Sequence, residues 1–141
     1  MIRRVPSPDA SGQSLLGRLG PAGGRLRLIA AIAGGIVALD AITKAVALHN
    51  LSGRGRVEIL GGLVQFDLYR NFAGPNNIFP GHTVVISLFV IAAVLVLLAV
   101  AYRVVSTPSA VVVGLMLGGA IGNLLDRLLR EPGPLRGGVV D

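Results

Sequence analysis

"LMLGGAIGNLLDRLLREPGPLRGGVVD", Leu115–Asp141, is the stretch that decides the fold of this 141-residue chain. A glycine-rich apolar helix runs into Asn123, Asp126 and Arg127, and a segment rich in glycine and proline then leads to "GGVVD". Ionisable groups inside a membrane are costly, and they usually mark functional sites. The stretch therefore predicts a membrane-spanning helix that carries a polar site where it leaves the bilayer.

The composition is that of an integral membrane protein. Hydrophobic residues make up 52% of the chain and charged residues only 14%, and the mean hydropathy is +0.73. Cysteine is absent, which excludes disulfides and thiolate metal sites. The two histidines, His49 and His82, are too few for a metal cluster. We therefore predict neither a metal nor another cofactor.

The net charge of +6 comes from 13 basic and 7 acidic residues, and all basic residues except Lys44 are arginines. Nucleic-acid binding is not indicated, because no basic run is interleaved with aromatic side chains. Arginines that flank apolar spans contact lipid headgroups instead. Membrane lipids are thus the partners that the charge pattern favours.

Three apolar segments are long enough to cross a membrane, at residues 28–48, 83–102 and 110–128. About 20 helical residues at 1.5 Å each cover a hydrocarbon core of about 30 Å. The first segment could also be a cleavable signal peptide, but it is long and contains Asp40 and Lys44, which favours a retained helix. Residues 1–24 are polar and rich in proline and glycine, which predicts a disordered tail before a membrane domain at residues 25–141.

Between the first two spans, "VEILGGLVQFDLYRN" (residues 57–71) contains two short apolar runs separated by Gly61 and Gly62. Apolar and polar residues alternate from Val64 to Tyr69, which is typical of a strand. We expect a small β-hairpin at the membrane surface. The "STPS" sequence at residues 106–109 is predicted to be a short loop between the second and third spans.

The spans alternate in direction, so the end of the first, the start of the second and the end of the third share one side of the membrane. The polar candidates on that side are Asp40, Lys44, Asn71, Asn123, Asp126, Arg127 and Asp141. The arginines divide evenly between the two sides, but five of them precede or open the first span. The positive-inside rule then favours a cytoplasmic N-terminus and an outer polar surface.

Spacing suggests how some of these residues interact. Asp40 and Lys44 are four positions apart, so their side chains can form an ion pair within the first span. Arg127 can hold a carboxylate through two hydrogen bonds, and we expect it to keep the neighbouring Asp126 ionised. Gly114, Gly118 and Gly122 recur every four residues, which allows another helix to approach closely.

Four motifs in this order resemble those of signal peptidase II. They are Asp40-x-x-Thr43-Lys44, Arg70-Asn71, "GGAIGNLLDR" at residues 118–127 and "VVD" at residues 139–141, and the resemblance covers residues 25–141. It implies a four-helix membrane fold with an extracytoplasmic β-cradle. It also implies a monomeric enzyme of the bacterial plasma membrane, with its N-terminus in the cytoplasm and its active site near the outer surface.

The resemblance further implies an aspartic endopeptidase. Its substrates would be prolipoproteins whose cysteine bears diacylglycerol, cut just before that cysteine. One catalytic aspartate of the family is in the "VVD" motif, which corresponds to Asp141. The residues that would support or line the site are Asp126, Asn123, Arg127, Asn71, Asp40 and Lys44.

The chain departs from the family pattern in two places. The family's "RNxGAAF" is "RNFAGPNNIF" here, and the later "FNxAD" motif, with the second aspartate and the fourth helix, is absent from the 141 residues. We therefore expect a truncated and inactive chain whose glycine face lacks its partner. A non-catalytic scaffold is the first alternative, although it would not need Asn123, Asp126 and Arg127 together. A small proton-coupled transporter is the second, although a proton relay would need polar residues on both sides of the membrane midplane.

Overall fold

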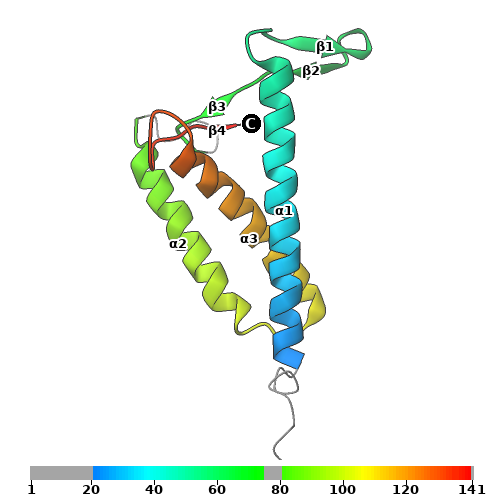
Figure 1. Cartoon of the computed structure of the whole chain (residues 1–141), viewed down its shortest axis with the longest axis vertical. Helices are drawn as coiled ribbons and strands as arrows, with labels where there is room; N and C mark the ends of the chain where they lie inside the picture. Colours follow the sequence, from blue (N-terminus) through cyan, green and yellow to red (C-terminus); the bar gives the residue numbers. More distant parts are fainter. Residues whose placement is uncertain (1–20, 75–80, 141) are drawn as a thin grey trace, which may run out of the picture.

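The computed structural model describes residues 21–74 and 81–140. Within these ranges, three helices are long and apolar enough to cross a membrane (Figure 1). They are α1 (Pro21–Leu51), α2 (Thr83–Ala101) and α3 (Thr107–Leu129). The predicted class, an all-α polytopic membrane protein with a small β-hairpin, is confirmed for this part of the chain.

The first residues of two helices differ from the predicted ones. Helix α1 begins at Pro21, inside the predicted tail of residues 1–24, and residues 1–20 lie outside the described part. Helix α3 begins at Thr107 rather than at residue 110, so "STPS" is a helix start and not a loop. The side chain of Ser106 accepts a hydrogen bond from the backbone N–H of Ser109 at 3.2 Å and so caps the helix. A proline in the first turn suits a helix start, because backbone N–H groups there have no partner within the helix and proline has no N–H.

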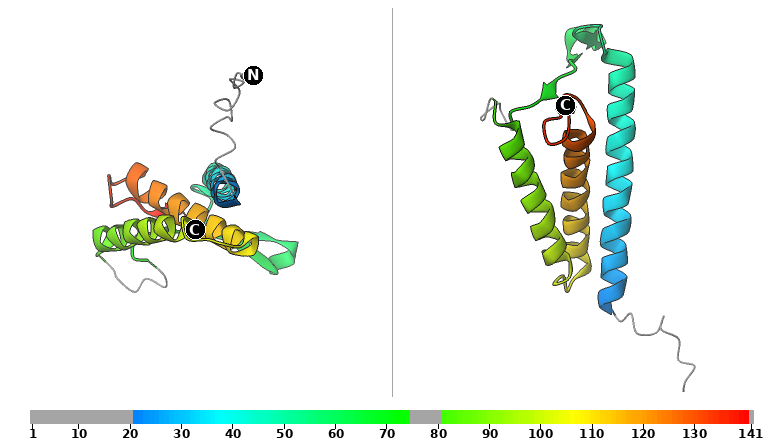
Figure 2. Two further views of the ribbon diagram at one scale, coloured as in Figure 1. Left: turned by 90° about the horizontal axis from the view of Figure 1, so that it is seen from below. Right: turned by 60° about the vertical axis from the view of Figure 1, so that its left-hand side comes forward.

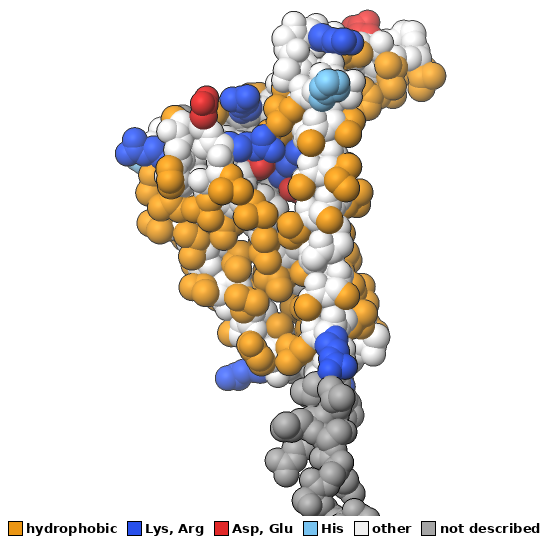
Figure 3. Space-filling model, viewed as in Figure 1, with side chains coloured by type: hydrophobic (Ala, Val, Ile, Leu, Met, Phe, Trp, Pro, Cys, Tyr) orange, Lys and Arg blue, Asp and Glu red, His pale blue; other side chains and the backbone are white. Residues whose placement is uncertain are grey.

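Helix α3 lies between α1 and α2 and packs against both (Figure 2). Small and branched apolar side chains form the buried core between the helices: Ile29, Ala33, Ala101, Ala110, Val113 and Leu117. Most other apolar side chains of the helices point outward. They form a broad belt between charged residues at the two ends of the bundle (Figure 3). Such a belt suits contact with lipid chains.

The glycine face of α3 packs against α1, so the expectation that it lacks a partner is wrong. A methyl group on Gly118 would lie 2.6 Å from Cβ of Ile36 and 2.9 Å from the carbonyl oxygen of Ala33. A methyl group on Gly114 would likewise lie 2.9 Å from Cβ of Ile32. Ile32 and Ile36 are four residues apart, as are the two glycines, so the ridge on one helix fits the groove on the other.

The connection between α1 and α2 contains the predicted hairpin. Strand β1 (Val57–Ile59) pairs antiparallel with β2 (Val64–Phe66). The 3-10 turn η2 (Leu60–Gly62) joins them, and Gly61 takes a φ of 67° there, which suits glycine. The glycine pair thus marks the turn, as the sequence indicated.

A second sheet joins segments that are far apart in sequence. Strand β3 (Arg70–Asn71) pairs antiparallel with β4 (Val139–Val140), with Asn71 opposite Val139 and Arg70 opposite Val140. In Figure 1 this sheet lies between the upper part of α1 and the adjoining ends of α2 and α3. The two valines of "VVD" thus bring the chain back to the bundle as a strand, and Asp141 lies outside the described residues.

Close backbone packing brings the chain back from α3 to β4. The N–H of Gly137 donates to the carbonyl oxygen of Arg127 at 3.2 Å. A side chain on Gly137 would collide with the carbonyl oxygens of Asp126 and Arg130, and one on Gly138 would meet the ring of Phe72 at 2.7 Å. Two consecutive glycines therefore allow the returning chain to lie directly on the end of α3.

Candidate active site

Lys44 is the centre of a polar cluster between α1 and α3. Its ammonium nitrogen lies 2.8 Å from Oδ2 of Asp40 and 2.9 Å from Oδ2 of Asp126. It also donates to Oδ1 of Asn123 at 3.4 Å. An ammonium group has three N–H donors, and these contacts give each one an acceptor. The predicted Asp40–Lys44 pair is confirmed, and it extends onto α3.

Asp126 connects three parts of the molecule. Its Oδ2 accepts from Lys44 on α1 and, at 3.2 Å, from the backbone N–H of Val140 on β4. Its Oδ1 accepts from Nε of Arg130, one turn later on α3. The residue is only 6% exposed, so these partners replace the water that the carboxylate loses. One side chain therefore fixes β4 relative to both helices.

The partners of Asp126 differ from the expected one. The sequence reasoning assigned it to the neighbouring Arg127, whereas Lys44 and Arg130 hold it in the structure. Consecutive residues on a helix point about 100° apart, while residues four positions apart lie on one face. Arg130 was missed for this reason, although its i, i+4 spacing from Asp126 was the signal that could have identified it.

Arg127 lies on a different side of the site. It is 3% exposed and lines a cavity of about 220 Å³ together with Asn71 of β3 and Asn123 of α3. Val139 of β4 also lines this cavity. Oδ1 of Asn71 accepts the N–H of Ala73 at 3.1 Å, which holds the chain in a tight turn as it leaves β3. Three predicted site residues therefore share one cavity beside the β3–β4 sheet.

Asp40 and Asp126 border a second cavity, of about 340 Å³. Gly122 and Arg130 line it as well. A methyl group on Gly122 would lie 2.5 Å from Oδ2 of Asp40, so the absence of a side chain leaves room for this carboxylate. The glycine repeat thus ends where the polar cluster begins.

Six of the seven predicted site residues lie in the described part of the chain, and the structure places all six around the end of α3. They are Asp40, Lys44, Asn71, Asn123, Asp126 and Arg127. The seventh, Asp141, follows β4 directly in sequence and lies outside the described residues. The altered loop after Asn71 is described only as far as Gly74.

The predicted site residues include none from α2, although this helix holds the segment that returns from α3 to β4. The hydroxyl of Ser87 is fully buried and lies 2.7 Å from the carbonyl oxygen of Leu135 and 2.9 Å from that of Thr83. Leu135 belongs to the segment that returns from α3 to β4. A lone serine in an otherwise apolar span was the available signal.

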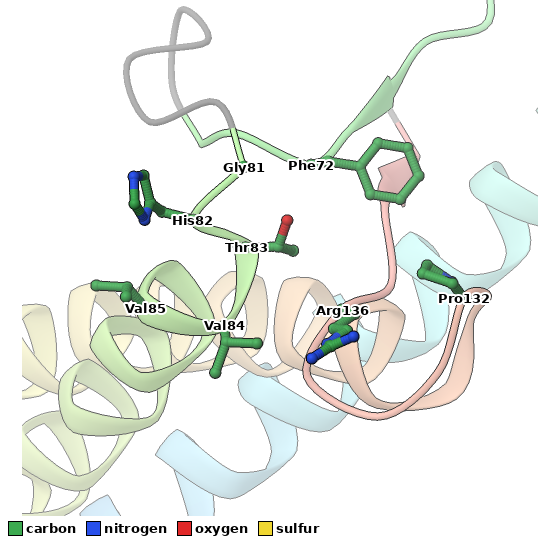
Figure 4. A pocket seen from close by; sticks show the side chains of 8 residues that line it. All are labelled: Phe72, Gly81, His82, Thr83, Val84, Val85, Pro132 and Arg136. Atoms are coloured by element: carbon green, nitrogen blue, oxygen red, sulfur yellow. The ribbon is translucent and has the colours of Figure 1, made fainter.

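The cavity of about 520 Å³ in Figure 4 is larger, but no predicted site residue lines it. Arg136 and Pro132 reach it from the returning segment, and Phe72 reaches it from the chain after β3. His82 and Thr83 at the start of α2 form another wall. The buried charges and amides are in the two smaller cavities, which are therefore the better candidates for chemistry.

Comparison with known proteins relates the chain to a family of peptidases. Residues 32–141 match the model of a peptidase family described as signal peptidase (SPase) II. The chain is 42% identical over 117 residues to a lipoprotein signal peptidase of Mycobacterium avium. It is 41% identical to one of Mycolicibacterium smegmatis over the same length, and 36% identical over 140 residues to one of Leifsonia xyli.

The aligned regions cover most of this chain but only part of each relative. They include 83% of the chain for the first two relatives and 99% for the third. The chain covers 64%, 50% and 63% of the three relatives in the same order. It therefore spans between half and two thirds of their length. No solved structure matches the chain significantly.

Proposed function

Because the chain belongs to the signal peptidase II family, we propose that it forms the first three helices and half of the active site of a membrane aspartic endopeptidase. Its substrates are prolipoproteins whose cysteine bears diacylglycerol, and the enzyme cuts just before that cysteine. The observation that carries the proposal is the contact of Asp126 with the N–H of Val140, one residue before Asp141.

Peptide hydrolysis by carboxylates needs two groups in different protonation states. One ionised carboxylate takes a proton from the attacking water, and one protonated carboxyl polarises the carbonyl and later protonates the amine that leaves. Two close carboxylates share one proton and supply both states. Asp141 is the first member of such a pair, and the aspartate of the family's "FNxAD" motif is the second.

The other polar residues position Asp141 and line the cleft. Asp126, held by Lys44 and Arg130, fixes the strand that leads to the catalytic residue. Asp40 completes the coordination of Lys44. Asn71, Asn123 and Arg127 surround the neighbouring cavity, where amide and guanidinium donors can hold the substrate backbone. These roles need no metal or other cofactor.

The proposed enzyme lies in the bacterial plasma membrane. Its N-terminus is cytoplasmic, and the polar end of the bundle faces the outer leaflet, where a lipidated prolipoprotein presents its cysteine. It acts as a monomer. The glycine face is occupied by α1 within the chain, so it is not a free surface on which a scaffold could assemble other proteins.

The test is complementation of a bacterial strain that lacks its own lipoprotein signal peptidase, with processing of a lipoprotein followed by gel mobility. The chain is expressed alone and as a form extended through the C-terminal part of the Mycolicibacterium smegmatis relative. We expect the extended form to restore processing and the 141 residues alone to leave the precursor uncut. Asp141→Asn in the extended form should abolish cleavage while the protein still accumulates in the membrane.

Asp67→Asn is the matched control, because Asp67 is an exposed aspartate beyond β2 and no role is proposed for it. It should leave processing unchanged. Cleavage by the extended form carrying Asp141→Asn would contradict the proposed catalytic role. Full processing by the 141 residues alone would show that the second aspartate is not needed.

A further inference from the structure

The hairpin formed by β1 and β2 has one apolar and one polar face. In an antiparallel pair, directly opposite residues point to the same side. Val57 lies opposite Phe66 and Ile59 opposite Val64, which places four apolar side chains on one face. Glu58 lies opposite Gln65 on the other face, where the Gln65 amide donates to the Glu58 carboxylate at 3.2 Å.

The apolar face is exposed in the structure, although its side chains are large. Ile59 is 42% exposed, Phe66 48% and Val64 37%. The turn adds two leucines at the tip, with Leu60 73% and Leu63 87% exposed. A contiguous apolar patch of this kind, next to polar residues on the opposite face, is typical of a surface that contacts another apolar phase.

The height of the hairpin above the bundle fits the edge of a bilayer. Counted from Leu28, about 20 helical residues cross the hydrocarbon core, which puts its outer edge near Leu48. Helix α1 ends at Leu51, about 5 Å beyond that edge. The hairpin begins six residues later, at Val57. Interfacial elements bury their apolar face about 5–10 Å into the boundary between headgroups and acyl chains, so the hairpin is within reach of it.

The apolar side of the hairpin is also continuous with the lipid-facing surface of the helices. In Figure 3, the apolar side chains of the hairpin lie on its lower side, toward the apolar belt along α1, and charged side chains lie on its upper side. The position of the hairpin and the continuity of this apolar surface therefore favour lipid over a protein as the occupant.

We propose that the apolar face of the hairpin, with Leu60 and Leu63 at its tip, inserts into the lipid interface of the leaflet at the Lys44 end of the bundle. β3 follows β2 after only three residues, so an inserted hairpin holds the β3–β4 sheet at the level of the headgroups. This second consequence rests on the proposed function, because a diacylglyceryl cysteine presents its scissile bond at that level. The insertion itself does not depend on catalysis.

The chain contains no cysteine, so single cysteines can be placed without removing others. Phe66→Cys and Gln65→Cys are each labelled with an environment-sensitive dye and reconstituted as the full chain in phosphatidylcholine–phosphatidylglycerol vesicles. Lipids carrying a nitroxide near the headgroup serve as one quencher, and aqueous iodide serves as the other. Gln65 precedes Phe66 on the same strand but lies on the polar face, which makes it the matched control.

We expect the dye at position 66 to emit at shorter wavelength and to be quenched by nitroxide lipids several-fold more strongly than the dye at position 65. Iodide should show the reverse order. Equal iodide quenching at both positions overturns the proposal. Protection of position 66 from both quenchers, rising with the protein-to-lipid ratio, also overturns it and identifies a second copy of the chain as the occupant.

The level of the site is tested without any activity measurement. A dye at Tyr69→Cys, between β2 and β3, reports how deeply this position lies in the membrane. The depth is measured with Tyr69→Cys as the only change and again with Leu60→Asp and Leu63→Asp added. We expect the charged tip to move this dye outward, so that nitroxide quenching falls and iodide quenching rises. Unchanged quenching, with position 66 inserted in the otherwise unaltered chain, would show that the hairpin inserts but does not set the level of the site.

Discussion

Along the interface between α1 and α3, the half that contains Gly114 and Gly118 packs backbone against aliphatic side chains, whereas the half beyond Gly122 joins the same helices through charges. The first half depends on shape alone, because a methyl group on Gly118 would already collide with Ile36. The second half depends on partners for each buried charge, because an unpaired charge in a low-dielectric site is costly.

The contrast teaches why one helix pair can be both a rigid support and a site. The glycine half brings the helix backbones close together and fixes their relative rotation. That rotation brings Lys44 within 2.9 Å of Asp126, although the two residues are on different helices. The four predictions that follow test this division, starting with the largest expected effect.

Replacing Lys44 by Met should have the largest effect on stability. It removes the cation that Asp40 and Asp126 share while keeping a side chain of similar length. We expect the free energy of unfolding in mixed micelles to fall by about 3–5 kcal/mol, because two carboxylates lose their common partner. The measurement is a titration with sodium dodecyl sulfate followed by circular dichroism. Asp67→Asn, at an exposed site, is the control, and equal stabilities of the two variants would contradict the role of Lys44.

Gly118→Ala tests the half that depends on shape. The added methyl would lie 2.6 Å from Cβ of Ile36, so the helices must separate, and we expect a loss of about 1–3 kcal/mol. Gly119→Ala is the matched control, since nothing lies within 4 Å of its added methyl. Alanine has a higher helix propensity than glycine, so the control substitution should be neutral or slightly stabilising. If the two variants lost stability equally, close packing would not explain the glycine repeat.

Ser87→Ala tests whether the charged half also needs α2. Loss of the hydroxyl leaves the Leu135 carbonyl without this donor, and we expect a cost of about 1 kcal/mol. Hydrogen exchange at Val139 and Val140 should become faster, because the returning segment is no longer tied to α2. Ser106→Ala removes a hydrogen bond at the far end of α3 and should leave that exchange unchanged. Equal exchange in both variants would rule out a positioning role for Ser87.

Gly122→Ala probes the point where the two halves meet, and its effect should be the smallest. The methyl would lie 2.5 Å from Oδ2 of Asp40, whose flexible side chain can move away. We expect a loss of about 0.5–1 kcal/mol that disappears in an Asp40→Ala background, because the two substitutions act on the same contact. A double-mutant cycle in micelles measures this coupling. If the effects of the two substitutions were additive, contact with Asp40 would not explain why a side chain at position 122 is unfavourable.

Much of the fold follows from patterns that are local in sequence. The spans near residues 28–48 and 83–102, the hairpin around Gly61 and Gly62, and the Asp40–Lys44 pair are all present in the structure. Spacing within one element was enough for each of them. The start of α3 was placed too late because "STPS" contains loop-forming residues that are equally suited to capping a helix.

The remaining contacts could not be read from spacing, since they join different elements. The same glycine repeat fits α1 or an additional helix, and only the packed structure distinguishes these partners. Three basic residues, at positions 44, 127 and 130, could have paired with Asp126. The rotation of α3 about its axis brings Asp126 to Lys44 and Arg130. The hydrogen bond from Ser87 to Leu135 spans 48 residues, beyond any local pattern.

The sequence by itself determined that this is a membrane protein whose candidate site residues gather at one end, because the cost of burying charge in lipid restricts where such residues can lie. It also carried the ordered motifs that relate the chain to its family. Only the tertiary structure decided which charges meet, that α1 fills the glycine groove, and that Asp126 holds β4. These depend on the rotation and distance between helices, which close packing sets and which no single segment encodes.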